Sequence, residues 1–398
     1  MSRPPTTVAR PFRARLRGLL ARLGLVAASV GIFAVGAELL LRVFPRLLPA
    51  GTYHGSGFHD PDLGFHLPDA PVLYDNVRFT RRVPNRDGMM DVDHAADKPP
   101  DVVRVGFFGD SYVAAVQVPL EEVFFRRLPP TVGGKRIETF GFGVPGLGTL
   151  HSLLMYRKFG PRYDLDVVVH LFVHNDAGDN AFAIQRRFQN RYMMRPSAVL
   201  APGDPGFEIE WGSPPSATPW TVRLARRLKS DSYLARLLFV RLQLLSLQAR
   251  QARQESDETV AAESSPVTLP GDPPSTWPPP LLADARELTR HLLAQLDREV
   301  RADGRRFLVL YVPLGNEELD GRVPETDRWL PWLAATCADL GISLVDPSDA
   351  LRCRLEAGDP VYDDHWSPAG HEVVAGVLAD ALEGVVESAG SHGSQTGG

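Results

Sequence analysis

The chain has 398 residues, which is enough for one large domain or two modest ones at about 100–200 residues per domain. Its hydrophobic content of 44% and charged content of 23% are ordinary for a globular protein, and a formal net charge of -5 does not indicate a nucleic-acid partner. Two cysteines, Cys337 and Cys353, exclude a disulfide-stabilised scaffold; whether the two pair is open at this stage.

The N-terminal 44 residues have the pattern of a membrane anchor. Residues 1–22 form a basic segment with six arginines and no acid, and residues 23–44 are almost entirely apolar. About 20 apolar residues can span a bilayer, and the preceding arginines predict a cytoplasmic N-terminus. We therefore expect an uncleaved transmembrane helix, with the rest of the chain outside the cytoplasm, periplasmic or extracellular. Glu38 lies near the outer end of the segment, where its charge can reach the interface.

A cleaved signal peptide is the alternative interpretation of the same segment. Small residues at 34, 36 and 37 could form a cleavage site, and the mature protein would then be secreted. Leucines continue beyond that site, which favours the anchor. Both interpretations place the remainder of the chain outside the cytoplasm.

The region that follows the anchor changes character near residue 101. Residues 45–100 are rich in Pro, Gly and Asp, and we expect a stalk and an irregular lead-in there. Residues 101–388 alternate between apolar runs and amphipathic stretches, which is typical of one α/β domain. The tail at 389–398 is small and polar, and we expect it to be disordered.

Strand and helix patterns alternate through this domain. Five apolar runs predict strands, at 102–108, 136–140, 166–173, 306–312 and 342–345. Helical patterns lie between and after them, at 120–128, 147–159, 281–302, 327–340 and 368–388. Because the runs are apolar on both faces, they indicate a five-stranded parallel sheet in a three-layer α/β/α sandwich.

An insertion at about 181–280 interrupts the alternation. It contains a basic amphipathic stretch, Trp220 to Arg253, followed by a polar, Pro-rich tract, Gln254 to Pro280. The tract is typical of a flexible loop. We expect the amphipathic stretch to form a lid or cap helix with solvated arginines; contact with an anionic membrane surface is the alternative.

Ser111 is the candidate nucleophile. The first predicted strand ends at Gly109-Asp110-Ser111, which delivers a hydroxyl to the carboxyl edge of the sheet, where open α/β folds keep their sites. Gly-Asp-Ser is also common turn chemistry, so the motif needs support from elsewhere in the chain.

That support comes from a histidine directly before the last predicted helix. The sequence Tyr362-Asp363-Asp364-His365-Trp366 places an imidazole next to carboxylates on one loop. His365 could take the proton from Ser111, and a carboxylate could fix its tautomer. The alternative is that an Asp starts the helix and His365 lies on the surface.

Acyl transfer also needs hydrogen-bond donors for an oxyanion. The Gly-rich turn around Gly143, after the second strand, can present a backbone N–H, and Asn175, after the third strand, can present a side-chain amide. With the N–H of Ser111 they would make three donors. A plain turn and a strand cap are the structural alternatives for Gly143 and Asn175.

In this order, Gly109-Asp110-Ser111, Gly143, Asn175-Asp176 and Asp363-Asp364-His365 resemble the four sequence blocks of the SGNH/GDSL hydrolase superfamily, most closely its bacterial membrane-anchored members. The resemblance implies a flavodoxin-like three-layer fold and metal-independent hydrolysis or transfer of acyl esters. It implies Ser111 as nucleophile, His365 as base and Asp363 as its acid, with Ser111, Gly143 and Asn175 forming the oxyanion hole. Asp364 is the alternative acid, and Asp110 and His174 are supporting residues.

The resulting hypothesis is an exported serine esterase that hydrolyses acyl esters, with acetyl the expected group, through an acyl-enzyme on Ser111. One alternative is an O-acetyltransferase acting on exopolysaccharide or cell-wall glycan. Another is a non-catalytic glycan-binding or scaffold protein. We expect an acyl-ester small molecule or acetylated glycan as partner, the membrane as a second partner through the N-terminal helix, and no cofactor, metal or nucleic acid.

Overall fold

A computed structural model describes residues 9–47, 51–53, 57–185, 195–212, 269 and 271–390, together with residues 221, 224, 228, 232–239, 241, 242 and 245. The predicted disordered tail lies almost entirely outside the described residues, and so does most of the Pro-rich tract at 254–280. The chain divides into two compact units, Met1–Ala50 with Leu224–Val260, and Gly51–Arg223 with Ala261–Gly398.

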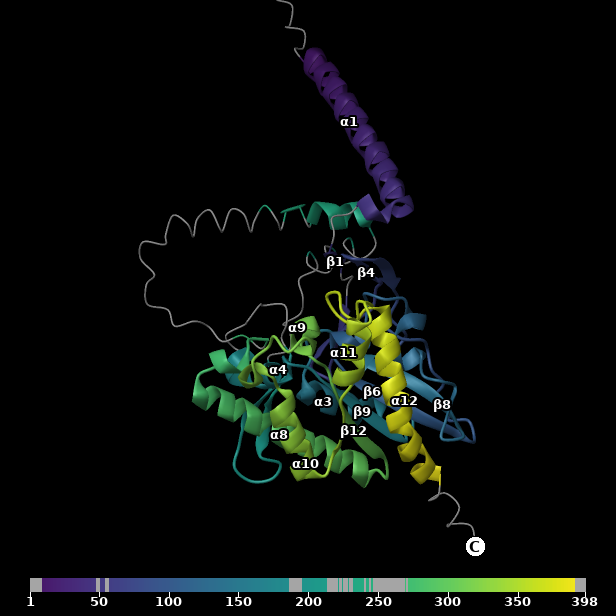
Figure 1. Ribbon diagram of the computed structural model, residues 1–398. Coiled ribbons are helices and arrows are strands. Elements are labelled where there is room, and N and C mark those ends of the chain that lie inside the picture. Colours follow the sequence, from purple (N-terminus) through teal and green to yellow (C-terminus); the bar gives the residue numbers. More distant parts are fainter. Residues whose placement is uncertain are drawn as a thin grey trace, which may run out of the picture. The chain divides into compact units, whose positions relative to one another are not determined.

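The smaller unit is built on one long helix. Helix α1, Ala9–Val43, is followed by the 3-10 turn η1, Pro45–Leu47, and residues 233–239 of the same unit are helical (Figure 1). The stretch Leu16–Val43 of α1 is long and apolar enough to cross a membrane, and its apolar side chains are largely exposed. An apolar N-terminal helix is therefore present, as the sequence predicted.

The larger unit contains a six-stranded sheet of order β13-β12-β9-β6-β8-β7. Five strands are parallel, namely β6 (Val102–Gly109), β8 (Lys135–Gly143), β9 (Val167–Phe172), β12 (Arg306–Tyr311) and β13 (Ser343–Val345). In chain order they run 2-1-3-4-5, the flavodoxin-like arrangement. The five predicted parallel strands and the fold class are confirmed; the sequence missed the antiparallel edge strand β7, Thr131–Val132.

Helices cover both faces of this sheet, because its strands are apolar on both sides (Figure 1). On one face α3 (Thr149–Phe159), α8 (Pro279–Ala302) and α10 (Leu330–Leu340) pack with Phe108 in one apolar cluster. On the other face α12 (Pro368–Gly390) and the turn η3 (Phe124–Arg126) pack with Phe107 in a second cluster. Adjacent residues of β6 thus face opposite layers of a three-layer sandwich.

Two expectations about local structure were wrong. The stretch 120–128 is not a helix but two 3-10 turns, η2 (Leu120–Glu122) and η3, in which Phe124 and Phe125 turn into the core. The lead-in is irregular only over residues 83–101, because residues 51–82 contain five short strands paired antiparallel. These are β1 (Gly51–Tyr53), β2 (Gly57–Asp60), β3 (Phe65–Pro68), β4 (Val72–Asp75) and β5 (Phe79–Arg82).

The remaining elements are short and lie in connections. The insertion carries an antiparallel hairpin of β10 (Ser197–Leu200) and β11 (Phe207–Glu210). Helices in the other connections are α2 (Ser111–Ala114), α4 (Asp176–Asn180), α5 (Phe182–Gln185), α9 (Gly315–Leu319) and α11 (Ser348–Glu356), with 3-10 turns η4 (Pro274–Thr276) and η5 (Glu325–Asp327).

Candidate active site

Ser111 lies at the point in the sheet where the strand order reverses. Strand β6 pairs with β8 on one side and with β9 on the other, and Ser111 follows β6 as the first residue of α2. Asp110 caps this short helix, since its Oδ1 accepts the N–H of Tyr112 at 3.0 Å. Open α/β sheets bind ligands at such switch points, outside the carboxyl ends of the strands.

Gly143 ends the neighbouring strand directly beside this turn. It is in register with Gly109, and the N–H of Val144 donates to the carbonyl of Gly109 at 3.3 Å. A Cβ at position 143 would lie 2.4 Å from the backbone nitrogen of Ala114 in α2. Because no side chain fits there, glycine is required by close packing of the strand end against α2.

His365 contacts the candidate nucleophile across the sheet edge. Its Nε2 lies 2.7 Å from Oγ of Ser111, which is hydrogen-bond distance for proton transfer. Burial lowers the pKa of His365 below its ordinary value of 6.5, and the nearby Asp364 carboxylate opposes that shift. The imidazole is therefore neutral near neutral pH, and Nε2 can accept the proton of Ser111.

Aromatic packing holds the histidine loop in place. Trp366 is fully buried, packs edge-on against Tyr112 at 5.0 Å between ring centroids, and donates its Nε1–H to the hydroxyl of Tyr362 at 2.8 Å. That hydroxyl donates to the carbonyl of Pro313 at 2.9 Å. The Tyr112 ring also lies 4.7 Å from the imidazole of His365. These contacts limit the positions that His365 can adopt.

The two candidate acids occupy different positions. Oδ2 of Asp364 is 3.5 Å from Nδ1 of His365, and among the described carboxylates it is the one within ion-pair distance of that nitrogen. The Asp364 side chain is 53% exposed. Asp363 uses its backbone N–H, which donates to the carbonyl of His365 at 2.8 Å and closes the turn. Asp363 as the triad acid stays a prediction.

Asn175 follows β9 and is held by charged neighbours. Its Nδ2 donates to Oδ2 of Asp179 at 2.5 Å, and Oδ1 of Asp179 accepts Nη2 of Arg195 at 2.5 Å. Gln185 donates to the same Asp179 oxygen at 3.1 Å. The amide of Asn175 thus has a defined orientation, with one of its two N–H groups engaged. The role of Asn175 and Gly143 as oxyanion donors stays a prediction.

His174 is a partly buried neighbour of the catalytic candidates. Burial lowers the pKa of His174 to about 4, and the charge of His365 adds to the shift. The described residue Gly271 packs against its imidazole, because a Cβ there would lie 3.4 Å from Nε2. His174 is therefore a neutral polar group near neutral pH, beside Gly271 at the end of the insertion.

Asp110 is buried beneath the nucleophile turn beside two further carboxylates. Burial raises the pKa of Asp110 to about 8, and the charges of Asp176 and Asp179 add to the shift. Asp110 is therefore mostly protonated at neutral pH. A neutral carboxyl can still accept the Tyr112 N–H, and it places no full charge beside Ser111.

Sequence reasoning missed several residues that position the site. Asp179 and Arg195 orient Asn175, and Trp366 and Tyr362 support His365. Asp179 stands four residues after Asn175, which is neighbour spacing on a helix and could have been noticed. Nothing in the sequence indicates that Arg195, from the insertion, reaches the same carboxylate.

Both cysteines are free, so the open question of a bridge is answered. Cys337 is buried, and burial raises the pKa of its thiol to about 12, whereas Cys353 is exposed.

No family model matches the chain, and no curated protein matches it. Several solved structures are similar to the chain. The structure of a lipase/acylhydrolase from Enterococcus faecalis is 11% identical, with a TM-score of 0.35, and the match covers 71% of this chain and 96% of that chain. A structure of a lipolytic protein of the G-D-S-L family from Desulfitobacterium hafniense is 10% identical with a TM-score of 0.35, over 70% and 99% of the two chains.

An acetyl xylan esterase, AlAXEase, is 12% identical with a TM-score of 0.37, over 70% of this chain and 100% of that chain. These structural neighbours are lipolytic esterases at low identity.

Proposed function

We propose that the chain is an exported serine esterase of the SGNH/GDSL type that hydrolyses acyl esters, with acetyl as the expected acyl group. The observation that carries the proposal is the 2.7 Å contact between Oγ of Ser111 and Nε2 of His365 at the switch point of the sheet. The pairing of a hydroxyl with a neutral imidazole is what a serine nucleophile requires.

The proposed reaction proceeds through an acyl-enzyme. Oγ of Ser111 attacks the ester carbonyl while Nε2 of His365 takes the hydroxyl proton, and His365 then returns that proton to the leaving alkoxide. The oxyanion accepts hydrogen bonds from the backbone N–H groups of Ser111 and Gly143 and from Nδ2 of Asn175. Each such donor contributes about 3 kcal/mol to transition-state stabilisation. Water, activated by His365, then releases the acid.

The first experiment uses the full chain in detergent with a fluorophosphonate probe and p-nitrophenyl acetate. Wild type should be labelled on Ser111 and release acetate, and S111A should lose labelling and at least about a thousandfold in turnover. His365→Ala should lose turnover similarly while keeping the wild-type circular dichroism spectrum. A folded wild type that neither labels nor turns over would contradict the esterase and favour a binding protein. Transfer of acetyl to an added sugar hydroxyl in preference to water would identify a transferase instead.

A pair of acid variants separates Asp364 from Asp363. We assign the orientation of His365 to Asp364, because its carboxylate is the one near Nδ1. Asp364 is half exposed, so we expect D364A to lower kcat by about 10- to 100-fold, less than loss of a buried triad acid costs. Asp363→Ala is the matched control, with a smaller loss measured on the same ester. A larger loss in D363A would reinstate the acid that the sequence spacing favours.

We also propose that α1 is retained as an anchor. Leu16–Val43 can cross a bilayer, and the arginines that precede it predict the orientation. The larger unit would then act outside the cytoplasm, on esters at or near the membrane.

A further inference from the structure

Glu38 is a carboxylate in the apolar stretch of α1. It lies five residues before Val43, or about 7–8 Å along a helix that rises 1.5 Å per residue. An ionisable side chain within a membrane span is costly unless it finds partners, and such a residue usually marks a functional contact. The partners of Glu38 therefore indicate what the outer end of α1 does.

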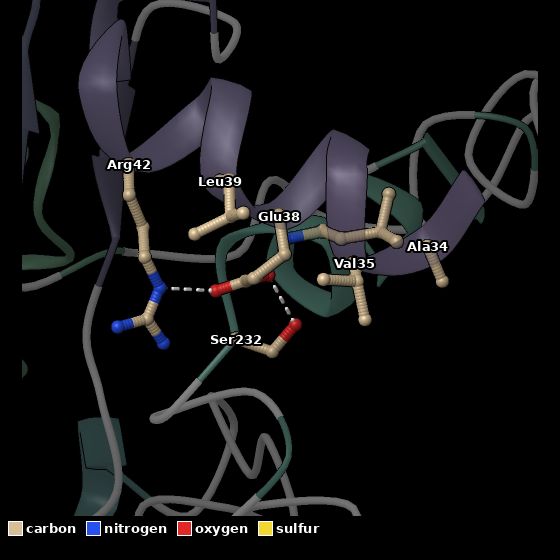
Figure 2. A pocket seen from close by; sticks show the side chains of 7 residues that line it. Ala34, Val35, Glu38, Leu39, Arg42 and Ser232 are labelled. Carbon is tan, nitrogen blue, oxygen red and sulfur yellow. Dashed lines mark hydrogen bonds and ion pairs between the residues drawn. The ribbon is translucent and has the colours of Figure 1, made fainter. Parts of the chain in front are cut away.

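Those partners are the N-terminus of the helix at 233–239 (Figure 2). Oε2 of Glu38 accepts the hydroxyl of Ser232 at 2.8 Å and the N–H of Leu234 at 2.9 Å, and Oε1 accepts the N–H of Tyr233 at 3.1 Å. Arg42 also donates to Oε1, at 2.7 Å. The first N–H groups of a helix have no partner within the helix, and a carboxylate satisfies both them and the helix dipole.

The contact continues along one face of α1. Ala34, Ala37, Glu38 and Leu41 are the described α1 residues that are partly or fully buried, and their spacing of three or four places them on one stripe. The guanidinium of Arg42 lies 5.9 Å from the ring centre of Tyr233. The helix at 233–239 thus contacts α1 around Glu38, and the other described side chains of α1 are exposed.

Leucines in and near the helix at 233–239 are exposed. Leu238, Leu242 and Leu245 are 57%, 65% and 61% exposed, and their spacing of four and three residues places them on one helical face. Leu224 and Leu228, four residues apart, are 48% and 53% exposed. Such an apolar face is costly in water unless a partner or a membrane covers it.

The charges of the same segment fit a membrane surface. Residues 220–253 contain eight Lys and Arg and one Asp. Basic residues beside an apolar helical face are typical of helices that lie in the interface of an anionic bilayer, about 5–10 Å deep. That depth matches the position of Glu38 below the end of α1.

We propose that the helix at 233–239, with Arg241, Leu242 and Leu245 after it, binds the membrane interface. It is tethered to the anchor by Glu38, with its exposed leucines in the outer leaflet and the basic residues beside them on anionic phospholipid headgroups. This inference rests on the proposal that α1 is retained as an anchor. If it is right, this part of the insertion is a second membrane contact and not a solvated lid helix. Glu38 then has a structural role, which is to hold this helix against the membrane-spanning helix.

The test compares a spin label on the apolar face of the segment with a label at an exposed site of the larger unit, in the full chain. Cys353→Ser removes the exposed thiol, and L242C in that background carries a nitroxide on the apolar face. The native Cys353, which is exposed, carries the reference nitroxide in the wild-type chain. The chains are reconstituted into vesicles of phosphatidylcholine with phosphatidylglycerol. We expect the label at 242 to collide with oxygen and to be protected severalfold from a water-soluble nickel complex, relative to the label at 353. Vesicles of phosphatidylcholine alone should reduce that protection.

Two outcomes separate this inference from the anchor on which it rests. A chain that alkaline carbonate removes from the vesicles overturns the anchor. A chain that is retained, but whose label at 242 is as accessible to nickel as the reference label at 353, overturns the interfacial segment and leaves the anchor standing.

The role of Glu38 is tested in the labelled L242C chain. Glu38→Ala removes the carboxylate that accepts the N–H groups of Tyr233 and Leu234 and should raise nickel accessibility at 242 severalfold. Glu38→Gln keeps an acceptor oxygen and should raise it less. Ester hydrolysis should be unchanged in both, because Glu38 lies outside the proposed catalytic machinery. Unchanged protection at 242 in E38A would show that Glu38 is not the tether.

Discussion

The protonation state of His365 is determined by the residues around it. Burial lowers the pKa of His365, the Asp364 carboxylate raises it, and the neighbouring His174 is neutral near neutral pH because its own pKa is about 4. The free imidazole is the form that can accept the Ser111 proton. Activity should therefore persist at pH values below the ordinary histidine pKa of 6.5.

This balance predicts how the pH profile of kcat/KM responds to substitution. The acid limb of wild type should fall below pH 6.5, since protonation of His365 removes the base. Asp364→Asn removes a negative charge that favours the imidazolium, so its acid limb should move to lower pH. Asp363→Asn, measured on the same ester, is the control and should keep the wild-type limb. A limb that moves upward in D364N would contradict the assigned interaction.

Only part of the site could be predicted one residue at a time. Ser111 and His365 stand in recognisable local patterns after a strand and before a helix, and the structure brings the two together. Asp179 and Arg195 could not be predicted with their roles, because their contact depends on how the insertion packs against α4. The choice between Asp363 and Asp364 likewise depends on side-chain directions within one turn.

At the scale of elements, the N-cap residue Asp110 stabilises α2, the short helix that begins with Ser111. Asp110 accepts the Tyr112 N–H and satisfies one of the unpaired donors at the start of this four-residue helix. Its pKa of about 8 means that the folded protein holds a proton there that the unfolded chain releases above about pH 4. Folding stability tied to Asp110 is therefore lost as pH rises from the ordinary carboxyl value toward 8.

Two substitutions at Asp110 test this account. Asp110→Ala removes the cap and should destabilise the fold by about 1 kcal/mol, measured as a lower thermal midpoint. Asp110→Asn keeps an acceptor without an ionisable proton, so its stability relative to wild type should increase as pH rises from about 4 to about 8. A constant difference between D110N and wild type across that range would mean that Asp110 is ionised in the folded protein.

Elements differ in how well local pattern predicts them. Strands β6, β9 and β12 are buried on both faces, so long apolar runs identify them. The short lead-in strands are stabilised by pairing with one another, which local composition does not reveal. The stretch 120–128 has a helical charge pattern, but packing of Phe124 and Phe125 into the core produces two separate turns.

At the scale of the whole molecule, the anchor determines where the chemistry takes place. Proteolysis of intact spheroplasts should degrade the region after residue 60, and a cytoplasmic marker should be spared. N-terminal sequencing of the membrane-bound protein should recover residues before 34, because an anchor is not cleaved. Protection of the larger unit would contradict the orientation, and a mature N-terminus near 38 would show a signal peptide.

The sequence by itself determined the class of the fold, the apolar N-terminal helix and the candidates Ser111, His365, Gly143 and Asn175. It could do so because burial on two faces, a span of apolar residues and turn chemistry are local properties of the chain. Tertiary structure decided which carboxylate faces His365, what orients Asn175, and that Glu38 caps a helix nearly 200 residues away. These outcomes depend on contacts between distant segments, and such contacts exist only once the chain has packed.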